Sequence, residues 1–250
     1  MQTVTILHTN DLHGKLTSDA EEIISSEKRF AKQALLLDSG DAISSGNIYF
    51  NPFGESILKR MSFLGYDAMA MGNREFHFLA KGLESKLRLA EFPVLCANIS
   101  GDDISQYVSP YLRMAVGDLK VIIFGLTIPM ITEMMTARKF SPFIFRDPIT
   151  TAMELVPALR PECDLLIALT HIGLKNDRIL AESVQGIDII SGGHSHTHLV
   201  EPLQIGRTHI LQAGWWGHFL GRAEFELDAD GVRLANSKHI DLRRSNIPPG

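Results

Sequence analysis

The sequence predicts an α/β protein whose functional residues lie where buried strands end. Short apolar runs of strand length recur along the chain, and the first spans residues 4–9. Stretches with helical periodicity lie between such runs, as at residues 18–33. Five of the runs end in Asp, His or Asn. Because sites in α/β sheets assemble at the carboxyl ends of strands, we expect these polar side chains to converge.

Length and composition favour one domain that acts on small molecules. The 250 residues include 45% hydrophobic residues and no Pro-, Gly- or Ser-rich linker, so one large core is expected. The formal net charge is −5, and Lys and Arg are scattered along the chain. This pattern offers no basic footprint for a nucleic-acid backbone. We therefore expect a small-molecule partner and no nucleic-acid partner, with the oligomeric state unknown.

No segment of the sequence has the pattern of a signal peptide or a membrane span. The first strand begins at residue 4, and no apolar run reaches the roughly 18 residues that a transmembrane helix needs. Cys96 and Cys163 have strand-like apolar neighbours and are expected to be reduced core residues. Together these features predict a soluble, cytoplasmic protein with no membrane partner.

The first strand delivers two metal-ligand side chains to a turn. Residues 4–9 lead into Asp11, His13 and Gly14. Asp11 and His13 are two residues apart, so they project to the same side of an extended backbone. Gly14 has no Cβ and lets the chain turn away. An Asp-x-His pair also occurs in solvated polar turns, so the assignment depends on further ligands.

The second apolar run ends in two carboxylates. Residues 34–37 lead into Asp38 and Asp41. Spacing does not decide which carboxylate faces the site and which caps the next segment. Residues 54–64 then predict a helix that ends at Gly65.

Asparagine and histidine end three further runs. The run that follows Gly65 stops at Asn73, whose amide oxygen is a neutral metal ligand. Later runs end at His171 and at the pair His194 and His196, again two residues apart. Repetition at separate strand ends is what distinguishes this pattern from a lone buried histidine.

The remaining segments predict structure without ligands. Residues 93–99 predict a strand ending in Asn98, which we expect to be structural. Residues 119–128 predict a hairpin arm and a core strand, and residues 149–159 a helix. The Met- and Phe-rich residues 130–145 predict either a packed satellite cluster or an adaptable lid.

The candidate ligands form a set of oxygen and nitrogen donors without sulfur. They are Asp11, His13, Asp41, Asn73, His171, His194 and His196. Seven ligands exceed what one ion usually takes from a protein. Two divalent ions about 3.5 to 4 Å apart, with a shared carboxylate, match the arrangement used for displacement at phosphorus. Manganese, zinc, iron, cobalt and nickel all suit this donor set. Asp38 and Glu75 are the candidates to orient its imidazoles.

The order of these motifs resembles the calcineurin-like metallophosphoesterases, and more narrowly the catalytic domain of the 5′-nucleotidase and 2′,3′-cyclic phosphodiesterase family. The resemblance rests on Asn10-Asp11-Leu12-His13-Gly14, Gly40-Asp41, Gly72-Asn73, Thr170-His171 and Gly193-His194-Ser195-His196. It implies a four-layer α/β/β/α sandwich with two mixed sheets and hydrolysis of small phosphoesters by a metal-activated water. It also implies that Asp11, His13, Asp41 and His196 hold one ion and that Asp41, Asn73, His171 and His194 hold the other.

The chain departs from the family at the residues closest to the chemistry. The family block reads Gly-Asn-His-Glu-Phe-Asp, whereas this chain has Arg74 and His77 in place of the histidine and aspartate. Arginine grips phosphoryl oxygens and offsets developing charge, but it does not act as a general acid. The hypothesis is an active hydrolase that favours leaving groups needing little protonation. The alternatives are that His77 supplies the acid, or that the protein is a catalytically silent metal binder.

Length is the second departure. The resemblance predicts a single catalytic domain over residues 1–250, without the C-terminal nucleotide-recognition domain of longer relatives. Substrate contacts would then come from local loops, with Arg74, Phe50, Trp215 and Trp216 as the candidates. The tandem tryptophans either stack on a base or pack at the rim. The histidines without motif context are predicted to be structural: His8, His198, His209, His218 and His239.

Overall fold

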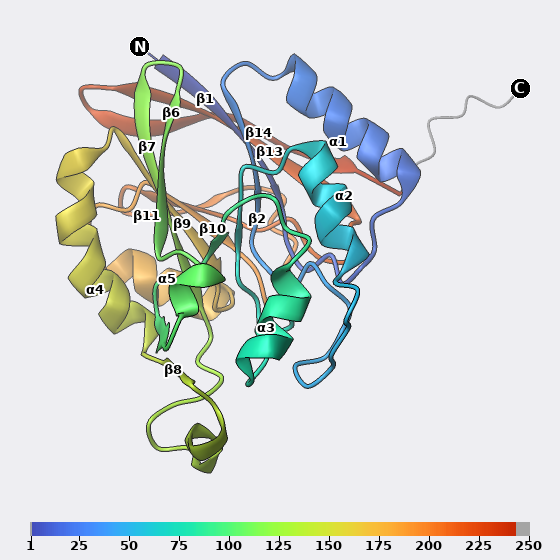
Figure 1. Ribbon diagram of the computed structural model, residues 1–250. Coiled ribbons are helices and arrows are strands. Elements are labelled where there is room, and N and C mark those ends of the chain that lie inside the picture. The colour runs from blue at the N-terminus through green and yellow to red at the C-terminus, as the bar shows by residue number, and fades with distance from the viewer. Residues whose placement is uncertain (1, 244–250) are drawn as a thin grey trace, which may run out of the picture.

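Two six-stranded sheets stack face to face, with helices on the outer side of each (Figure 1). The computed structural model describes residues 2–243, so the chain end at 246–250, on which the predicted lack of a second domain rests, lies outside the described residues. In order across the first sheet lie β14 (Gly231–Asp241), β13 (Phe219–Asp228), β1 (Gln2–Thr9), β2 (Ala34–Asp38), β3 (Ala68–Ala70) and β4 (Val94–Leu95). In order across the second lie β11 (Leu203–Ile205), β12 (Thr208–Leu211), β10 (Ile189–Gly192), β9 (Leu165–His171), β7 (Leu119–Thr127) and β6 (Tyr111–Val116).

Both sheets are mixed. Strands β1 to β4 run parallel. At one edge, β13 pairs antiparallel with β1, and β14 pairs antiparallel with β13. Strands β7, β9, β10 and β12 run parallel, with β6 and β11 antiparallel at the two edges. A small third sheet pairs β5 (Ile99–Gly101) with β8 (Phe143–Phe145). Parallel strands place their carboxyl ends at one edge, where the connecting loops meet.

Helices cover the outer faces of both sheets. On the first sheet lie α1 (Ser18–Phe30), α2 (Ser56–Leu64) and α3 (Ala80–Leu87), and on the second α4 (Pro148–Leu159) and α5 (Leu174–Ser183). Three short 3-10 helices complete the elements within residues 2–243: η1 (Ile104–Gln106), η2 (Thr136–Phe140) and η3 (Arg160–Glu162). The arrangement confirms the expected α/β/β/α sandwich.

Strand alternation divides the core into an inner layer and two outer layers. In β1, Val4 and Ile6 pack between the sheets, whereas Leu7 packs under the helices of the first sheet. In β2, Leu35 and Leu37 face inward in the same way. Strands buried on both faces are mainly apolar on both, which explains their near-continuous hydrophobic runs.

The helix boundaries follow local signals. Thr17 caps α1 by accepting the backbone N–H of Ala20. The helix ends at Phe30, three residues before the predicted end at Gln33. Helix α2 ends as predicted, because Gly65 adopts the left-handed conformation with φ of 73°.

The predicted strand at residues 93–99 is shorter in the structure. Only Val94–Leu95 of the predicted strand 93–99 joins the first sheet. Asn98 is structural as predicted: its side chain donates to the carbonyls of Thr127 and Arg146 at 2.8 and 3.0 Å. Bonds to two distant segments replace continued strand pairing here.

Residues 130–145 divide between packing and exposure. Phe143 and Phe145 are buried in the core under the first sheet, as the packed-cluster interpretation requires. Met134 is 94% exposed and Phe140 69% exposed, so the tip of this segment does not pack. The packed-cluster interpretation is therefore correct for the end of the segment and wrong for its middle.

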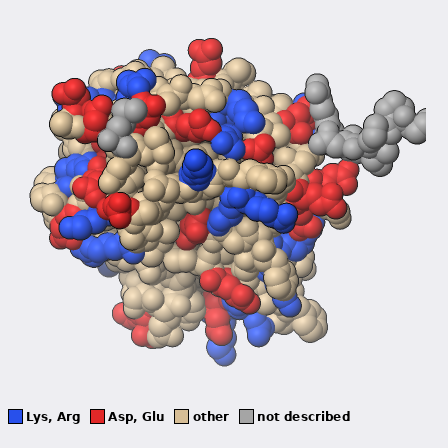
Figure 2. All heavy atoms as spheres, turned by 90° about the horizontal axis from the view of Figure 1, so that it is seen from above, with Lys and Arg blue, Asp and Glu red and all other residues tan. Residues whose placement is uncertain are grey.

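Both cysteines are free thiols, and charged side chains of both signs are mixed on the surface. Cys96 is a buried free thiol, as predicted, whereas Cys163 is free but only half-buried. Figure 2 shows acidic and basic side chains intermixed over the face seen from the top of Figure 1. Within residues 2–243, no helix combines the length and the apolar character required to cross a bilayer.

The two sheets come into backbone contact at Gly125 of β7. A Cβ on Gly125 would lie 2.2 Å from the carbonyl oxygen of Leu95, which belongs to β4 of the facing sheet. Backbone atoms cannot rotate away, so only glycine fits. We expect Gly125→Ala to lower the free energy of unfolding by about 2 kcal/mol or more in a urea titration. Gly46→Ala is the control, since no atom lies within 4 Å of the new Cβ. Equal stability of the two variants would contradict this account.

Candidate metal site

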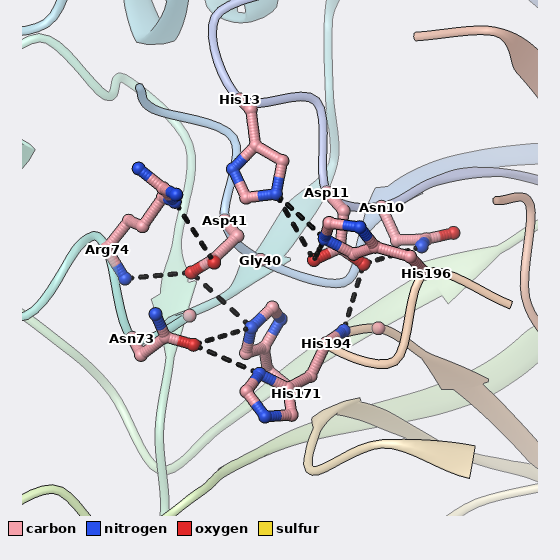
Figure 3. A network of polar contacts seen from close by, with 12 residues as sticks. Asn10, Asp11, His13, Gly40, Asp41, Asn73, Arg74, His171, His194 and His196 are labelled. Atoms are coloured by element: carbon pink, nitrogen blue, oxygen red, sulfur yellow. Dashed lines mark hydrogen bonds and ion pairs between the residues drawn. The ribbon is translucent and has the colours of Figure 1, made fainter. Parts of the chain in front are cut away.

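The seven predicted ligands lie together at the carboxyl ends of five strands (Figure 3). Asp11 and His13 follow β1, Asp41 follows β2 and Asn73 follows β3, all in the first sheet. From the second sheet, His171 ends β9, while His194 and His196 follow β10. The site therefore straddles the junction of the two sheets, where parallel strands of both end.

One group of donors surrounds a buried carboxylate. The Nε2 atoms of His13 and His196 lie 2.9 Å apart. They lie 3.8 and 3.3 Å from Oδ1 of Asp11. This Oδ1 is buried and has no hydrogen-bond partner. A buried carboxylate oxygen without a donor and two imidazole nitrogens aimed at it fit a divalent cation.

A second group centres on Asn73. Its Oδ1 atom lies 3.2 Å from Nε2 of His171 and 3.1 Å from Nδ1 of His194. Asp41 Oδ1 lies 3.4 Å from the same His171 nitrogen. Donor atoms of Asp11 lie within 4.8 Å of both groups, those of His13 and His196 and those of Asp41 and His171. Asp11 thus lies between the two groups, while the bridging role of Asp41 stays a prediction.

Most of the ligands are held in a strained backbone conformation. Five of them have positive φ: Asp11 at 51°, His13 at 47°, Asp41 at 55°, His194 at 76° and His196 at 51°. Residues other than glycine adopt this region at a cost of order 1–3 kcal/mol, and such strain clusters at functional sites. Bonds between loops hold it in place. The backbone N–H of Asp11 donates to the Gly40 carbonyl and that of His13 to the Asp41 carbonyl, both at 2.9 Å.

Backbone carbonyls, not carboxylates, orient the buried imidazole. Nδ1 of His171 donates to the Ser39 carbonyl at 2.8 Å, which orients the ring with Nε2 facing Asp41. The sequence-based expectation that Asp38 and Glu75 orient imidazoles is wrong. Asp38 is fully buried at the end of β2, where it accepts hydrogen bonds from the Thr9 hydroxyl and the Gly40 amide.

The second group carries a stabilised proton when no cation is bound. Burial lowers the pKa of His171, but the hydrogen bond and charge of Asp41 outweigh burial and raise this pKa to about 9. A cation that binds Nε2 must displace this proton, so metal affinity should rise with pH.

Arg74 lies at the open edge of the site. Its backbone N–H donates to Oδ1 of Asp41 at 2.8 Å, and its Nε lies 3.6 Å from Oδ2 of the same carboxylate. Its Nη1 donates to the Ser44 carbonyl at 2.8 Å. The side chain is 37% exposed, so the guanidinium is anchored beside the ligands and still accessible.

His77 is buried against α3. The ring is stacked on Phe78 with centroids 4.9 Å apart, and its Nδ1 accepts the backbone N–H of Leu79 at 3.0 Å. A Cβ on Gly82 would lie 2.1 Å from this nitrogen, so the ring packs directly on α3. Burial lowers the pKa of His77 and favours the neutral ring. None of the hydrogen bonds or ion pairs among residues 2–243 joins His77 to a predicted ligand.

The predicted substrate-binding aromatics lie in different environments. Trp215 is half-buried and stacks parallel to the His196 ring, with centroids 6.2 Å apart and planes at 11°. Trp216 is 50% exposed, and its backbone N–H donates to the Asp11 carbonyl at 2.7 Å. Phe50 is 51% exposed on the loop before α2. Trp215 thus supports a ligand, while Trp216 and Phe50 are free to contact other molecules.

The histidines without motif context lie outside the site. His198 stacks on Phe219 and on His239, with centroids 4.0 and 4.6 Å apart. His8 lies edge-on to His239 at 6.0 Å, and its Nδ1 is buried without a partner. Burial lowers the pKa of His8 to about 3, so its ring is a neutral packing element.

Sequence reasoning missed two residues that support the ligands. Asn10 donates to Oδ2 of Asp11 at 2.8 Å and accepts the Ala213 amide at 2.7 Å. Gln212 accepts the Ser195 hydroxyl and the Thr197 amide, each at 2.9 Å, and so holds the turn that carries the last two histidines. Position directly before Asp11 was a usable signal for Asn10. Gln212 had none.

Fold and site define the class of protein: an α/β/β/α sandwich whose converging strand ends present oxygen and nitrogen ligands for divalent metal ions. The chain belongs to the calcineurin-like phosphoesterase family, whose sequence model matches residues 4–198. Proteins of this metallophosphoesterase family use divalent metal ions, and the buried, partnerless Asp11 oxygen and the donor set described above fit such ions.

Named relatives narrow the comparison. The chain is 34% identical to the trifunctional nucleotide phosphoesterase protein YfkN of Bacillus subtilis, over 96% of this chain and 19% of that protein. It is 32% identical to the 5′-nucleotidase of Homo sapiens, over 98% of this chain and 50% of that protein. The chain therefore spans about half the length of that 5′-nucleotidase.

Solved structures share the fold. A 5′-nucleotidase precursor from Thermus thermophilus matches with a TM-score of 0.76 and 29% identity, covering 95% of this chain and 54% of that one. The NAD nucleotidase of Haemophilus influenzae matches with a TM-score of 0.81 and 22% identity, covering 94% and 55%. The second match shows the fold alone.

Removing the Asp11 charge should abolish metal binding without lowering the stability of the metal-free protein. In Asp11→Asn the side-chain oxygen still accepts from Asn10, while the new amide replaces the partnerless oxygen. In chelator we expect the melting temperature to equal or exceed that of the wild type. At 100 times the dissociation constant, manganese should raise the wild-type melting temperature by about 5 to 10 °C and leave the variant unchanged. Exposed Asp102→Asn is the control, and an equal manganese response in Asp11→Asn would contradict the assignment.

Proposed function

We propose that the chain is a metal-dependent phosphoester hydrolase that acts on nucleotides or related small phosphomonoesters and phosphodiesters with two divalent ions. The observation that carries the proposal is the convergence of all seven donor side chains at one junction of two sheets. The names of the relatives support the substrate class. When bound, the ions would supply Lewis-acid polarisation of the phosphoryl group and a water of lowered pKa as the nucleophile.

The residues of the chain position the substrate and offset its charge. Arg74 is anchored by Ser44 and Asp41 and is accessible, so its guanidinium can bind phosphoryl oxygens as negative charge builds up. Exposed Phe50 and Trp216 offer apolar faces for a leaving group.

Protonation of the leaving group is the step for which this chain has no evident donor. Arginine keeps its proton at any working pH. His77 faces α3 and its pKa is lowered, which disfavours its proposed role as the acid. We therefore propose that aryl, cyclic or pyrophosphate-type leaving groups are preferred over a nucleoside alkoxide.

Activity should depend on Asp41. With manganese-loaded protein we expect hydrolysis of bis(p-nitrophenyl) phosphate and p-nitrophenyl phosphate, and much slower release of phosphate from AMP. Asp41→Asn should reduce all rates to background, because this carboxylate serves the second donor group and Arg74. The exposed Asp102→Asn variant should retain the wild-type rates.

Protein that binds two metal ions and yet hydrolyses none of the three substrates would instead support a catalytically silent metal-binding protein. The observation that favours this second candidate is Arg74 itself, at a position where the family block carries histidine.

Replacing Arg74 tests the leaving-group proposal directly. Arg74→His restores an imidazole that can carry a proton, so we expect the AMP rate to rise relative to the p-nitrophenyl phosphate rate by about tenfold or more. Arg74→Lys, which keeps the charge but lacks both an acid near neutral pH and the guanidinium fork, is the matched control. If Arg74→His lowers both rates by the same factor, the leaving-group account is wrong.

A further inference from the structure

Two buried ionisable side chains, Glu75 and Lys86, join the loops that border the site. The two loops are residues 41–46, after β2, and residues 72–76, after β3. Glu75 is fully buried and accepts hydrogen bonds from backbone amides of both loops. Its carboxylate accepts from the backbone N–H groups of Asp41, Ile43 and Gly72 at 2.9, 3.1 and 2.8 Å. A buried carboxylate with three amide donors ties the two loops together.

Lys86 donates hydrogen bonds to backbone carbonyls of the same two loops. It projects from the last turn of α3 and is 0% exposed. Its Nζ donates to the carbonyls of Gly46, Arg74 and Phe76 at 2.7, 2.5 and 3.2 Å. The three donors of an ammonium group are therefore matched by three backbone acceptors, one in the first loop and two in the second.

The charge of Lys86 is balanced locally. Burial lowers its pKa to about 8, while the carboxylates of Glu75 and Glu55 act in the opposite direction. The ammonium form therefore still predominates at neutral pH. A buried ammonium is costly unless paired and hydrogen-bonded, so these loops can keep this charge only in the arrangement that satisfies it.

Lys86 acts on Arg74 from two sides. It holds the carbonyl of Arg74 itself, and it holds Gly46 in the loop whose Ser44 carbonyl receives the Arg74 guanidinium. Backbone and side chain of Arg74 are thus both anchored to segments that the same ammonium joins. Lys86 is buried behind these loops and makes no hydrogen bond to any of the seven donors within residues 2–243.

We propose that Lys86 is a positioning residue that holds the Arg74 guanidinium against the phosphoryl group. This inference rests on the proposed function, in which Arg74 binds phosphoryl oxygens. Misplacement by about 1 Å costs on the order of 100-fold in rate. A buried support therefore matters even though it never touches the substrate.

The first test replaces the ammonium by an apolar chain of similar length. We expect Lys86→Met to lower kcat/KM for p-nitrophenyl phosphate by about 10- to 100-fold, with bound manganese per chain unchanged. Lys81→Met is the matched control, because Lys81 is an exposed lysine of the same helix. It should keep the wild-type kcat/KM. An unchanged kcat/KM in Lys86→Met, or loss of manganese, would overturn the proposal.

A double-mutant cycle distinguishes positioning from general loss of structure. In an Arg74→Ala background the guanidinium is absent, so adding Lys86→Met should change kcat/KM by less than about twofold. A merely structural lysine would give losses that multiply. Should Lys86→Met fail to fold, Lys86→Gln keeps an uncharged donor. We expect Lys86→Gln to lower kcat/KM only when Arg74 is present, and a loss independent of Arg74 would overturn the proposal.

Binding of inorganic phosphate separates this inference from the proposed function. In manganese-loaded protein, calorimetry should show weaker phosphate binding in Arg74→Ala and in Lys86→Met, with no further loss in the double variant. Wild-type protein that binds phosphate with this pattern but hydrolyses no ester would contradict the proposed function and leave the positioning role supported. Phosphate binding that is insensitive to Lys86→Met would contradict the positioning role even in an active enzyme.

Discussion

The structure depends on keeping two carboxylates buried where the two sheets meet. Asp11 is 0% and Asp41 4% exposed, and their charges lie among imidazoles and backbone amides. Burial of charge without partners is costly, so each loop around them must supply a donor. The His194 amide and the Asn10 side chain bond Oδ2 of Asp11, and the Arg74 amide bonds Asp41. Oδ1 of Asp11 is buried without a hydrogen-bond donor, and a divalent cation would satisfy it.

The same constraint explains the backbone strain. Strands end with side chains that alternate in direction, and a regular continuation would point ligands two residues apart away from the neighbouring sheet. Left-handed residues at Asp11, His13 and Asp41 turn the chain sharply, and hydrogen bonds from one loop to the next keep it there. Strain, burial and ligand convergence are therefore one property of this junction, supported from behind by Glu75 and Lys86.

Much of the site was accessible from the sequence because its pattern is local. Ligand types stand directly after apolar runs, and parallel strands place such positions at one edge. Roles that depend on the direction of a side chain could not be predicted in the same way. His77 occupies a motif position, yet its ring packs on Gly82 of α3. Asp38 was a reasonable partner for an imidazole, but the strand turns it toward Thr9.

The sequence by itself determined the α/β class, the strand ends that carry candidate ligands and the end of α2 at Gly65. These follow from periodicity, residue chemistry and glycine conformation, which act over a few residues. Only the tertiary structure decided that Asp11 lies between both donor groups, and that Lys86 supports Arg74. Those facts depend on distances between segments far apart in the chain, which are set by how sheets and helices pack and not by any local pattern.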